Sequence, residues 1–514
     1  MPMTDDRHPL PPDVSFDGGD LDCGNGLLLL IRRHIDPLER GGLLEIRSTE
    51  ISVEEDLPAW CRLTGNELIS FTRQGTLRSF LVCKGALKER RATGPSPRLA
   101  VESAGTVPVH IPASLPPPAP APAIPALSIF GIGSWPRPRW MLRAIHERLE
   151  GRLSEEEFHA TGDDAVRLAV EAQLRAGVDV VTDGEQRRDS YANFIGGRLD
   201  NCQLIPLTDL LPLVDHPEEL AEQFKSLDVP ASEIRHPAAF GKIGRSRPIA
   251  GHELQFAKTL TNRPVKVALP GPYLLSRVMW MECISDRAYA SREELAKDIV
   301  RVLREELFFL LAGGAAIVQF DEPVLTEVVH TGPKTGRTFM CGALSAKQDV
   351  QKELEFARDL INAVVKGAPR DRTAIHVCRG NWTPDESAAL TGDYRPLTML
   401  LRGLDVGAYF LELCTPRAGE IEVLRGLPDD RRIGVGVVNP KRPEVESVEE
   451  ILAKARRAVD LFGRERVLFN PDCGFATFAD NPVASAAAAE GKLRAIASAA
   501  GKIRDSRTAP ASPS

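Results

Sequence analysis

The sequence predicts an α/β fold: a (β/α)8 TIM barrel preceded by a small two-layer α/β sandwich domain. Three features of the chain after residue 127 lead to the barrel. Short β-rich runs recur, long helical patterns separate several of them, and polar residues gather where the runs end. A length of 514 residues exceeds one ordinary domain, and 43% hydrophobic with 26% charged residues is typical of a globular protein with a sizeable core.

Eight runs carry the strand pattern. They are 128–134, 178–185, 265–272, 315–323, 373–378, 408–414, 432–438 and 466–474. Apolar residues recur with helical spacing in 163–177, 291–314 and 447–463. Alternating strands and helices over one chain favour a barrel of eight βα units. An open, doubly wound sheet is the alternative, but no GxGxxG turn follows the first run.

Composition divides the chain into four segments. The prediction places a small domain at 14–86, a Pro/Ala-rich linker at 87–126, the barrel at 127–503 and a disordered tail at 504–514. The stretch SLPPPAPAPAIPA in the linker cannot continue a helix or a sheet ladder, which predicts an extended spacer. A docked proline-rich arm is the alternative.

The small domain is predicted to run strand, helix, strand, helix, strand. Residues 26–38 and 57–65 have helical spacing, whereas LLEIRS at 43–48 and SFLVCK at 79–84 are strand-like. Such a succession is typical of two layers, with helices packed on one sheet.

Charge, targeting signals and cysteine usage point to a cytoplasmic protein. A net charge of −7 gives no electrostatic reason to expect nucleic acid. The start has no secretory signal pattern, and the longest apolar run, LLLLI at 27–31, is far too short to cross a membrane. Nine cysteines spread over the chain argue against a disulfide framework, so Cys beside His and Glu suggests a metal or catalytic group.

Polar and metal-capable side chains gather at the carboxyl ends of the predicted strands. They are Ser134, Asp183, Glu185, Asp321, Glu322, His376, Cys378, Glu412, Asp472 and Cys473. Barrel enzymes build their active sites on this face, so we expect these side chains to meet at one mouth.

Four of them suit zinc. His376 and Cys378 alternate along a strand and therefore point to the same side. With Glu412 and Cys473 from neighbouring strands they offer two sulfurs, one imidazole and one carboxylate, a set that favours zinc over magnesium or calcium. The HxC pair alone is a weak signal, because a buried Cys is usually a small apolar residue and a lone His a satisfied polar one.

These runs resemble the catalytic barrel of the cobalamin-independent methionine synthase family. The matching pieces, in the family's order, are IGSWPRP (132–138), DGEQRR (183–188), LPGPY (269–273), QFDEP (319–323), IHVCRG (375–380), LELCTP (411–416), GVGVV (434–438) and NPDCGF (470–475). The resemblance covers residues ~127–490.

The resemblance implies a zinc-dependent S-methyltransferase of methionine synthesis. His376, Cys378, Glu412 and Cys473 would be the Zn2+ ligands, and Ser134, Glu185 and Asp321 would hold the amino-acid end of a homocysteine-like thiol. The implied partners are that small-molecule thiol and a folate or corrinoid methyl donor. For the two carboxylates the alternative is an ion pair with Arg187 or Arg188.

The chain departs from the family pattern near the methyl donor. Val278 stands where the family usually has a Trp after LPGP, with Trp280 two residues on, and Lys441 falls near the family's proton-relaying His. The alternative function is therefore zinc-dependent alkyl transfer to another thiol, from an epoxide or a non-folate methyl donor. No general acid or base is assigned.

The small domain resembles TusA-like sulfur carriers through FDGGDLDCGNGLLLLIRRHI (16–35) and EEDLPAWCRLTGNELI (54–69). Cys23 stands at the carrier position, but Gly24, Asn25 and Gly26 replace the family's Pro-x-Pro. A helix N-terminus lowers a thiol pKa, so Cys23 is a candidate sulfur carrier. The resemblance implies a sulfur-relay role, with a sulfur-relay or corrinoid protein as partner; a degenerate docking module is the alternative.

Overall fold

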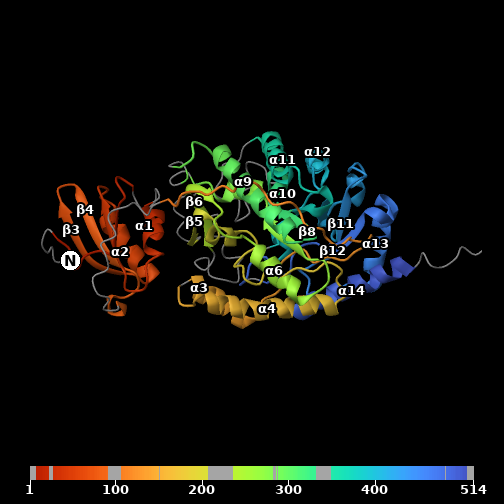
Figure 1. Cartoon of the computed structure of the whole chain (residues 1–514), viewed down its shortest axis with the longest axis horizontal. Coiled ribbons are helices and arrows are strands. Elements are labelled where there is room, and N and C mark those ends of the chain that lie inside the picture. Colours follow the sequence, from red (N-terminus) through yellow and green to blue (C-terminus); the bar gives the residue numbers. More distant parts are fainter. Residues whose placement is uncertain are drawn as a thin grey trace, which may run out of the picture.

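The chain folds into a small and a large α/β domain that lie side by side (Figure 1). This computed structural model describes residues 7–21, 27–90, 106–149, 151–206, 235–281, 285, 288–330, 349–381, 383–480 and 482–505. Cys23 and its three following residues lie outside that range. No helix within the described ranges is both long and apolar enough to span a membrane.

A four-stranded sheet with two helices forms the small domain. Its elements are β1 (Val14–Asp17), α1 (Leu28–Ile35), β2 (Leu43–Ser48), α2 (Val53–Thr64), β3 (Glu67–Gln74) and β4 (Leu77–Cys83). The strand order is β1-β2-β4-β3, with β1 parallel to β2 and the other pairs antiparallel. Side chains of α1 and α2, including Ile31 and Trp60, pack with Ile46 and Phe80 of the sheet.

The sequence did not predict strand β3. Its second half, Thr72–Gln74, is polar and half-buried or exposed, because β3 lies at the edge of the sheet. Pairing with β4 across a turn at Gly75, whose φ is +64°, makes this segment a strand. The local sequence carries little apolar alternation by which to recognise it.

The large domain contains a six-stranded parallel sheet in chain order. Its strands are β7 (Lys266–Pro270), β8 (Ile317–Asp321), β9 (Thr373–Val377), β10 (Ala408–Leu411), β11 (Arg432–Val438) and β12 (Val467–Pro471). The first two predicted runs form single parallel bridges instead of strands. Ile129 bridges to Phe469, Phe130 to Val180, and Val181 to Val265.

Helices cover this sheet. They are α3 (Arg139–Leu149), α4 (Glu155–Arg175), α6 (Gly251–Leu260), α7 (Pro272–Val278), α9 (Arg292–Ala312), α10 (Val324–His330), α11 (Val350–Val365), α12 (Thr398–Gly403), α13 (Val448–Phe462) and α14 (Ala486–Asp505). The three predicted helical segments are present in α4, α9 and α13. Capping boxes at Ser154 and Ser447 fix the starts of α4 and α13. Helix α14 includes the first two residues of the predicted tail, and 506–514 lie outside the described range.

A hairpin that the sequence reading missed connects the two domains. Strands β5 (Asp200–Pro206) and β6 (Arg235–Gly244) are antiparallel and lie, in the chain, between Val181 and β7. The hairpin packs on the end of α7, where the His236 ring contacts the Val278 carbonyl at 2.6 Å. On its other side, Arg33 lies 4.0 Å over the Phe240 ring, and Gln203 Nε2 donates to Asp36 at 3.2 Å. The small domain is therefore docked through the residues at and beyond α1.

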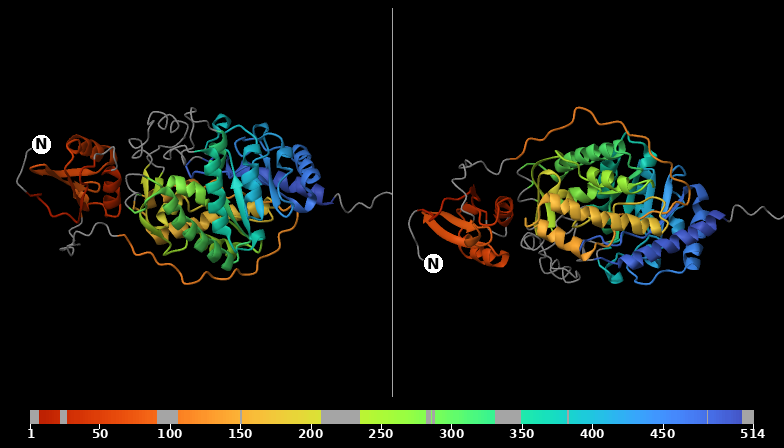
Figure 2. Two further views of the ribbon diagram at one scale, coloured as in Figure 1. Left: turned by 90° about the horizontal axis from the view of Figure 1, so that it is seen from above. Right: turned by 60° about the horizontal axis from the view of Figure 1, so that its bottom comes forward.

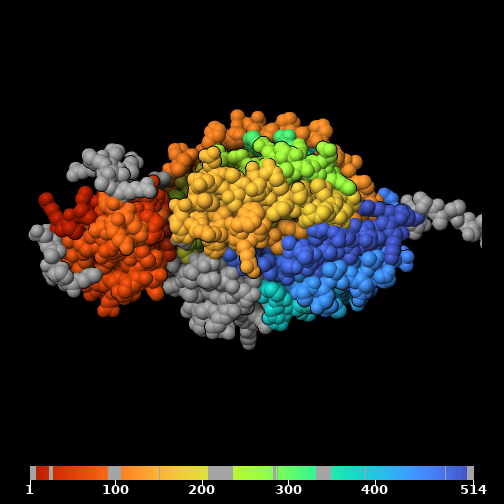
Figure 3. Space-filling view, turned by 90° about the horizontal axis from the view of Figure 1, so that it is seen from below, coloured from red at the N-terminus to blue at the C-terminus, as the bar shows by residue number. Residues whose placement is uncertain are grey.

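The described part of the linker, 106–126, runs along the wall of the large domain (Figures 2 and 3). At the hairpin, Asn201 bonds both backbone groups of Val107, at 2.7 and 2.9 Å. At the opposite end, Arg372 donates to the Ala119 carbonyl, and Arg432 donates to the Ile124 and Pro125 carbonyls at 2.8 and 2.6 Å. This extended segment therefore has fixed contacts at both ends.

Candidate functional site

A cavity opens at the carboxyl ends of the strands. It is lined by, among others, Ser134, Glu185, Asp321, His376, Cys378 and Cys473. All six side chains are buried. Six of the seven predicted site residues of the large domain thus face one cavity, and Glu412 is the exception.

Three of these side chains form a cluster that could hold a metal ion. Ligand atoms of His376, Cys378 and Cys473 all lie within 4.8 Å of one another. A tetrahedral zinc ion with bonds of about 2.0–2.3 Å separates its ligands by roughly 3.5–3.8 Å. His376 Nδ1 contacts the Phe410 carbonyl at 3.0 Å, and its buried Nε2 has no hydrogen-bond partner in the part of the chain described. The geometry and donor atoms therefore fit zinc.

The two cysteines of the cluster interact closely. The contact with Cys473 lowers the pKa of Cys378 well below its ordinary value, and the same contact, together with burial, raises the pKa of Cys473. Of the two sulfurs, Cys378 is therefore the more readily deprotonated. A thiolate held in place in this way is the form that binds a soft metal ion.

Glu412 follows β10 and lies beside Arg379. Its carboxylate Oε2 is 4.0 Å from Arg379 Nε, and burial with the negative charge of Cys378 raises the pKa of Glu412 to about 8. Arg379 is fully buried over the Tyr394 ring, and none of its three nitrogens has a hydrogen-bond partner among the described residues. This cation offsets the negative charge that two cysteines and a carboxylate bring to the cluster.

Asp472 supports the cluster without joining it. Its Oδ1 accepts hydrogen bonds from the backbone N–H groups of Leu413 and Cys414, both at 2.9 Å. A Cβ at Gly436 would lie 2.0 Å from that oxygen, so only glycine leaves the carboxylate its place. Asp472 thereby fixes the backbone that follows Glu412.

Ser134 and Glu185 also line the cavity. Ser134 Oγ accepts from the Ala476 N–H at 3.2 Å. Glu185 has a φ of +54°, a left-handed backbone that non-glycine residues rarely adopt. Arg137 and Asp183 hold this backbone: Arg137 donates to the Glu185 carbonyl at 2.6 Å, and Asp183 accepts from the Glu185 N–H at 3.0 Å. Arg137 and Asp183 therefore fix the position of the Glu185 backbone.

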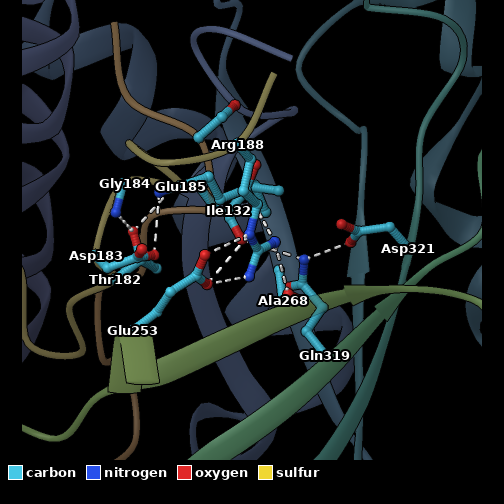
Figure 4. Close-up of polar contacts among 12 residues, drawn as sticks. Ile132, Thr182, Asp183, Gly184, Glu185, Arg188, Glu253, Ala268, Gln319 and Asp321 are labelled. Carbon is cyan, nitrogen blue, oxygen red and sulfur yellow. Dashed lines mark hydrogen bonds and ion pairs between the residues drawn. The ribbon is translucent and has the colours of Figure 1, made fainter. Parts of the chain in front are cut away.

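Arg188 lies near Glu185 but directs its hydrogen bonds to other groups. Arg188 forms its short bond with Glu253, at 2.6 Å, and donates to the Ala268 carbonyl at 2.9 Å (Figure 4). Its distance to Glu185 Oε1 is 3.7 Å, and Glu185 Oε2 has no hydrogen-bond partner within the described ranges. Arg187 pairs with Asp163 instead. Arg188 therefore lies within ion-pair distance of one Glu185 oxygen, as the alternative expects, while the other oxygen has no hydrogen bond within the described ranges.

Asp321 ends β8 directly beside His376 in the sheet register. Its Oδ1 accepts from Gln319 Nε2 at 2.6 Å. Burial, with the charge of Glu185 adding to it, raises the pKa of Asp321 to about 7. Burial also raises the pKa of Glu185. Two buried carboxyl groups that face one cavity suit a cationic ligand group.

The residues at which the chain departs from the family pattern do not line this cavity. Val278 is fully buried beneath the hairpin. The Lys441 ammonium donates to the carbonyls of Thr383 and Asp385. Burial lowers the pKa of Lys441 to about 8. Sequence reasoning missed Asn381, Tyr191 and Phe478 as lining residues, although Asn381 directly follows the CRG motif.

A model of the family described as "Cobalamin-independent synthase, Catalytic domain" matches residues 128–500. The chain belongs to this family. Among curated relatives, the methionine synthase of Sulfolobus acidocaldarius is 29% identical over 344 residues, which cover 67% of this chain and 84% of the relative. The methionine synthase of Thermococcus kodakarensis is 28% identical over 353 residues, covering 68% and 87%. The residues matched by the family model lie in the large domain.

Solved structures support the fold. A B12-independent methionine synthase from a Shewanella species, in complex with selenomethionine, has a TM-score of 0.56 at 21% identity and covers 75% of this chain and 100% of that one. A putative vitamin-B12 independent methionine synthase from Listeria monocytogenes has a TM-score of 0.52 at 20% identity, covering 73% and 96%.

Gly133 gives a steric test of the cavity wall. A Cβ added there would lie 2.2 Å from Glu185 Oε1, so we expect Gly133→Ala to displace the Glu185 carboxylate. Such overpacking costs about 1–3 kcal/mol, and the Michaelis constant for the thiol substrate should rise about tenfold. Gly501→Ala in α14, where no atom lies within 4 Å of the new Cβ, is the control. Equal kinetics in both variants would contradict the placement of Glu185.

Proposed function

We propose that this protein is a zinc-dependent S-methyltransferase that methylates the thiol of homocysteine and so forms methionine. The observation that carries the proposal is the cluster of His376, Cys378 and Cys473 beside two buried carboxyl groups in one cavity. Membership of the cobalamin-independent synthase family supports the reaction.

In this proposal His376, Cys378, Glu412 and Cys473 hold the zinc ion. A zinc ion bound there lowers the pKa of a coordinated thiol, so that the thiol is present as the nucleophilic thiolate at neutral pH. Arg379 offsets part of the negative charge of the ligand set, and Asp472 keeps the backbone after Glu412 in place.

Ser134, Glu185 and Asp321 bind the amino-acid end of the substrate. The Oε2 of Glu185, which has no hydrogen-bond partner among the described residues, and the carboxylate of Asp321 suit its α-ammonium group. Because the cavity wall buries these groups, the ammonium exchanges water for charged partners in a site of low polarity, which favours an amino-acid thiol over a simple thiol.

We also infer a closed eight-stranded barrel of the TIM type. The bridges at Ile129, Phe130 and Val181 would join β12 to β7 through the first two predicted runs. Such a ring has one mouth, at which the site residues of different strands converge.

The methyl donor is tested directly. We expect the purified protein to form methionine from homocysteine with methyltetrahydrofolate or with methylcobalamin. Transfer from methyltetrahydrofolate alone would exclude the non-folate alternative. Methionine from neither donor would overturn the proposed reaction. The buried Val278 offers no aromatic face for a pterin, so both donors belong in the assay.

The sulfur-relay role of Cys23 stays a prediction. Mass spectrometry of the intact protein after exposure to a persulfide donor would show an added sulfur atom on Cys23. The Cys23→Ala variant serves as the control, and an unmodified Cys23 would contradict the relay.

The pH dependence of substrate binding follows from Asp321. Its raised pKa of about 7 means that the carboxyl is neutral below this pH and charged above it. The α-ammonium of the substrate keeps its proton up to about pH 8. We therefore expect the affinity for homocysteine, relative to 4-mercaptobutanoate, to rise between about pH 6 and 7.5. Taking the ratio cancels the titration of the thiol, and a ratio that does not change with pH would contradict the assignment.

A further inference from the structure

Lys266 and Gln319 are buried directly beneath the cavity, and the reaction proposed above gives them no role. Lys266 is the first residue of β7. Gln319 and Asp321 alternate along β8, so their side chains leave the strand on the same side. Lys266 and Gln319 are at most 1% exposed, and neither lines the cavity itself.

The partners of Lys266 fix its own position. Its ammonium donates to the Ile132 carbonyl at 2.7 Å and to Gln319 Oε1 at 2.5 Å, and lies 4.6 Å from the centre of the Phe410 ring. Burial lowers the pKa of Lys266 to about 7, whereas the charges of Asp321 and Glu185, two oxygen acceptors and the face of an aromatic ring favour its protonated form.

Lys266 fixes the orientation of the Gln319 amide. An ammonium group can only donate, so the amide must present its oxygen to Lys266. The amide nitrogen then donates to the Ile132 carbonyl at 3.1 Å and to Asp321 Oδ1 at 2.6 Å (Figure 4). The hydrogen bond from the Gln319 amide thereby fixes the position of Asp321 Oδ1.

Gln319 also stands between the cation and the carboxyl groups. Among the described residues no ion pair within 4.0 Å joins Lys266 to Asp321 or to Glu185, although the charges of both act on Lys266. A direct ion pair would leave Asp321 neutralised from within the protein. With the amide in between, the carboxylate is oriented but still free to bind a cation from the cavity.

We propose that Gln319, oriented by Lys266, is a positioning residue that makes Asp321 available to the amino group of the thiol substrate. The proposal rests on the function proposed above and deepens it, because it assigns the preference for an amino-acid thiol to a pair of residues outside the cavity. Homocysteine and 4-mercaptobutanoate differ only in that amino group, so the ratio of their affinities measures the effect.

Two variants test the proposal. Gln319→Leu removes both amide bonds at a similar volume, and Gln319→Glu keeps the bond from Lys266 but has no N–H to donate to Asp321. We expect each to lower the homocysteine preference about tenfold through KM, with kcat at saturation and the kinetics of 4-mercaptobutanoate within about twofold of the parent. The matched control is Gln173→Leu, a buried amide that bonds the backbone of Thr182 and does not itself line the cavity.

Equilibrium binding separates this inference from the reaction. Cobalt(II) replaces zinc, and each thiol is titrated while the visible absorption of the cobalt is followed, so that no methyl donor is needed. If the parent binds homocysteine but methylates no thiol, the proposed methyl transfer is wrong. The ratio of the affinities for homocysteine and 4-mercaptobutanoate still tests the role of Gln319. The proposal would be overturned if a variant lost affinity for both thiols equally, or if either variant kept the parent's preference for homocysteine. It would also be overturned if the parent bound both thiols equally well. Thermal unfolding and cobalt content check that the variants are folded and loaded.

Discussion

Cys473→Ser is expected to remove the metal and the activity together. The parent should contain about one zinc per chain, and the variant less than about 0.1, because a hydroxyl is a poor ligand for zinc compared with a thiolate. Metal analysis of the purified proteins gives the result, and methionine formation should fall below detection. Cys378→Ser should behave in the same way, since the two thiols share the cluster with His376.

Cys414→Ser is the matched control. Cys414 also follows a strand end, but its Sγ lies 3.0 Å from the Lys454 ammonium and outside the cluster. This variant should keep its zinc and its activity. Loss of zinc from Cys414→Ser, or full zinc in Cys473→Ser, would contradict the ligand assignment. Glu412→Gln should lower zinc affinity less, because the amide oxygen that replaces the carboxylate is still an oxygen donor, although it carries no charge.

Asp321→Asn is expected to weaken homocysteine binding about 10- to 100-fold. A hydrogen bond between charged groups contributes roughly 1.5–3 kcal/mol, and the amide that replaces the carboxylate carries no charge. The effect should appear in KM for homocysteine and not for 4-mercaptobutanoate. Steady-state kinetics with both thiols provide the measurement.

Asp183→Asn is a useful comparison for Asp321→Asn. Asp183 is also a buried carboxyl, with a pKa raised to about 7 by burial, but it accepts from the Glu185 backbone and does not line the cavity. We expect Asp183→Asn to act on both thiols alike, through the position of Glu185. If Asp321→Asn impaired both thiols equally, its role would be structural and the amino group would bind elsewhere.

The sequence was most informative at the strand ends. His376, Cys378 and Cys473 could be brought together from the order of the strands, because parallel strands present their carboxyl ends at one edge. The position of Glu412 could not be predicted. The Glu412 carboxylate lies beside Arg379, a buried cation that follows a different strand. No pattern in the local sequence indicates this interaction.

The remaining features depend on contacts between distant segments. The sequence does not distinguish Lys266 and Gln319 from other strand residues. Their roles depend on hydrogen bonds of Lys266 with the Ile132 carbonyl and of Gln319 with Asp321. The hairpin of β5 and β6 was missed because its strands are separated in sequence by 28 residues, 207–234. Single bridges at Ile129 and Val181 were read as full strands, since their apolar patterns do not distinguish the two.

The contacts of the linker have a consequence for the order of assembly during synthesis. Ala119 and Ile124 bind arginines that stand 253 and 308 residues later in the chain. At about 5–20 residues per second, a ribosome takes roughly 15–60 s to make those partners. The small domain is complete long before then, so it can fold while its connection to the rest of the chain is still loose. The contact of Val107 with Asn201 can form early, whereas Ile124 and Pro125 can be bound only once Arg432 of β11 has emerged, which makes the attachment of this end of the linker a late step in maturation.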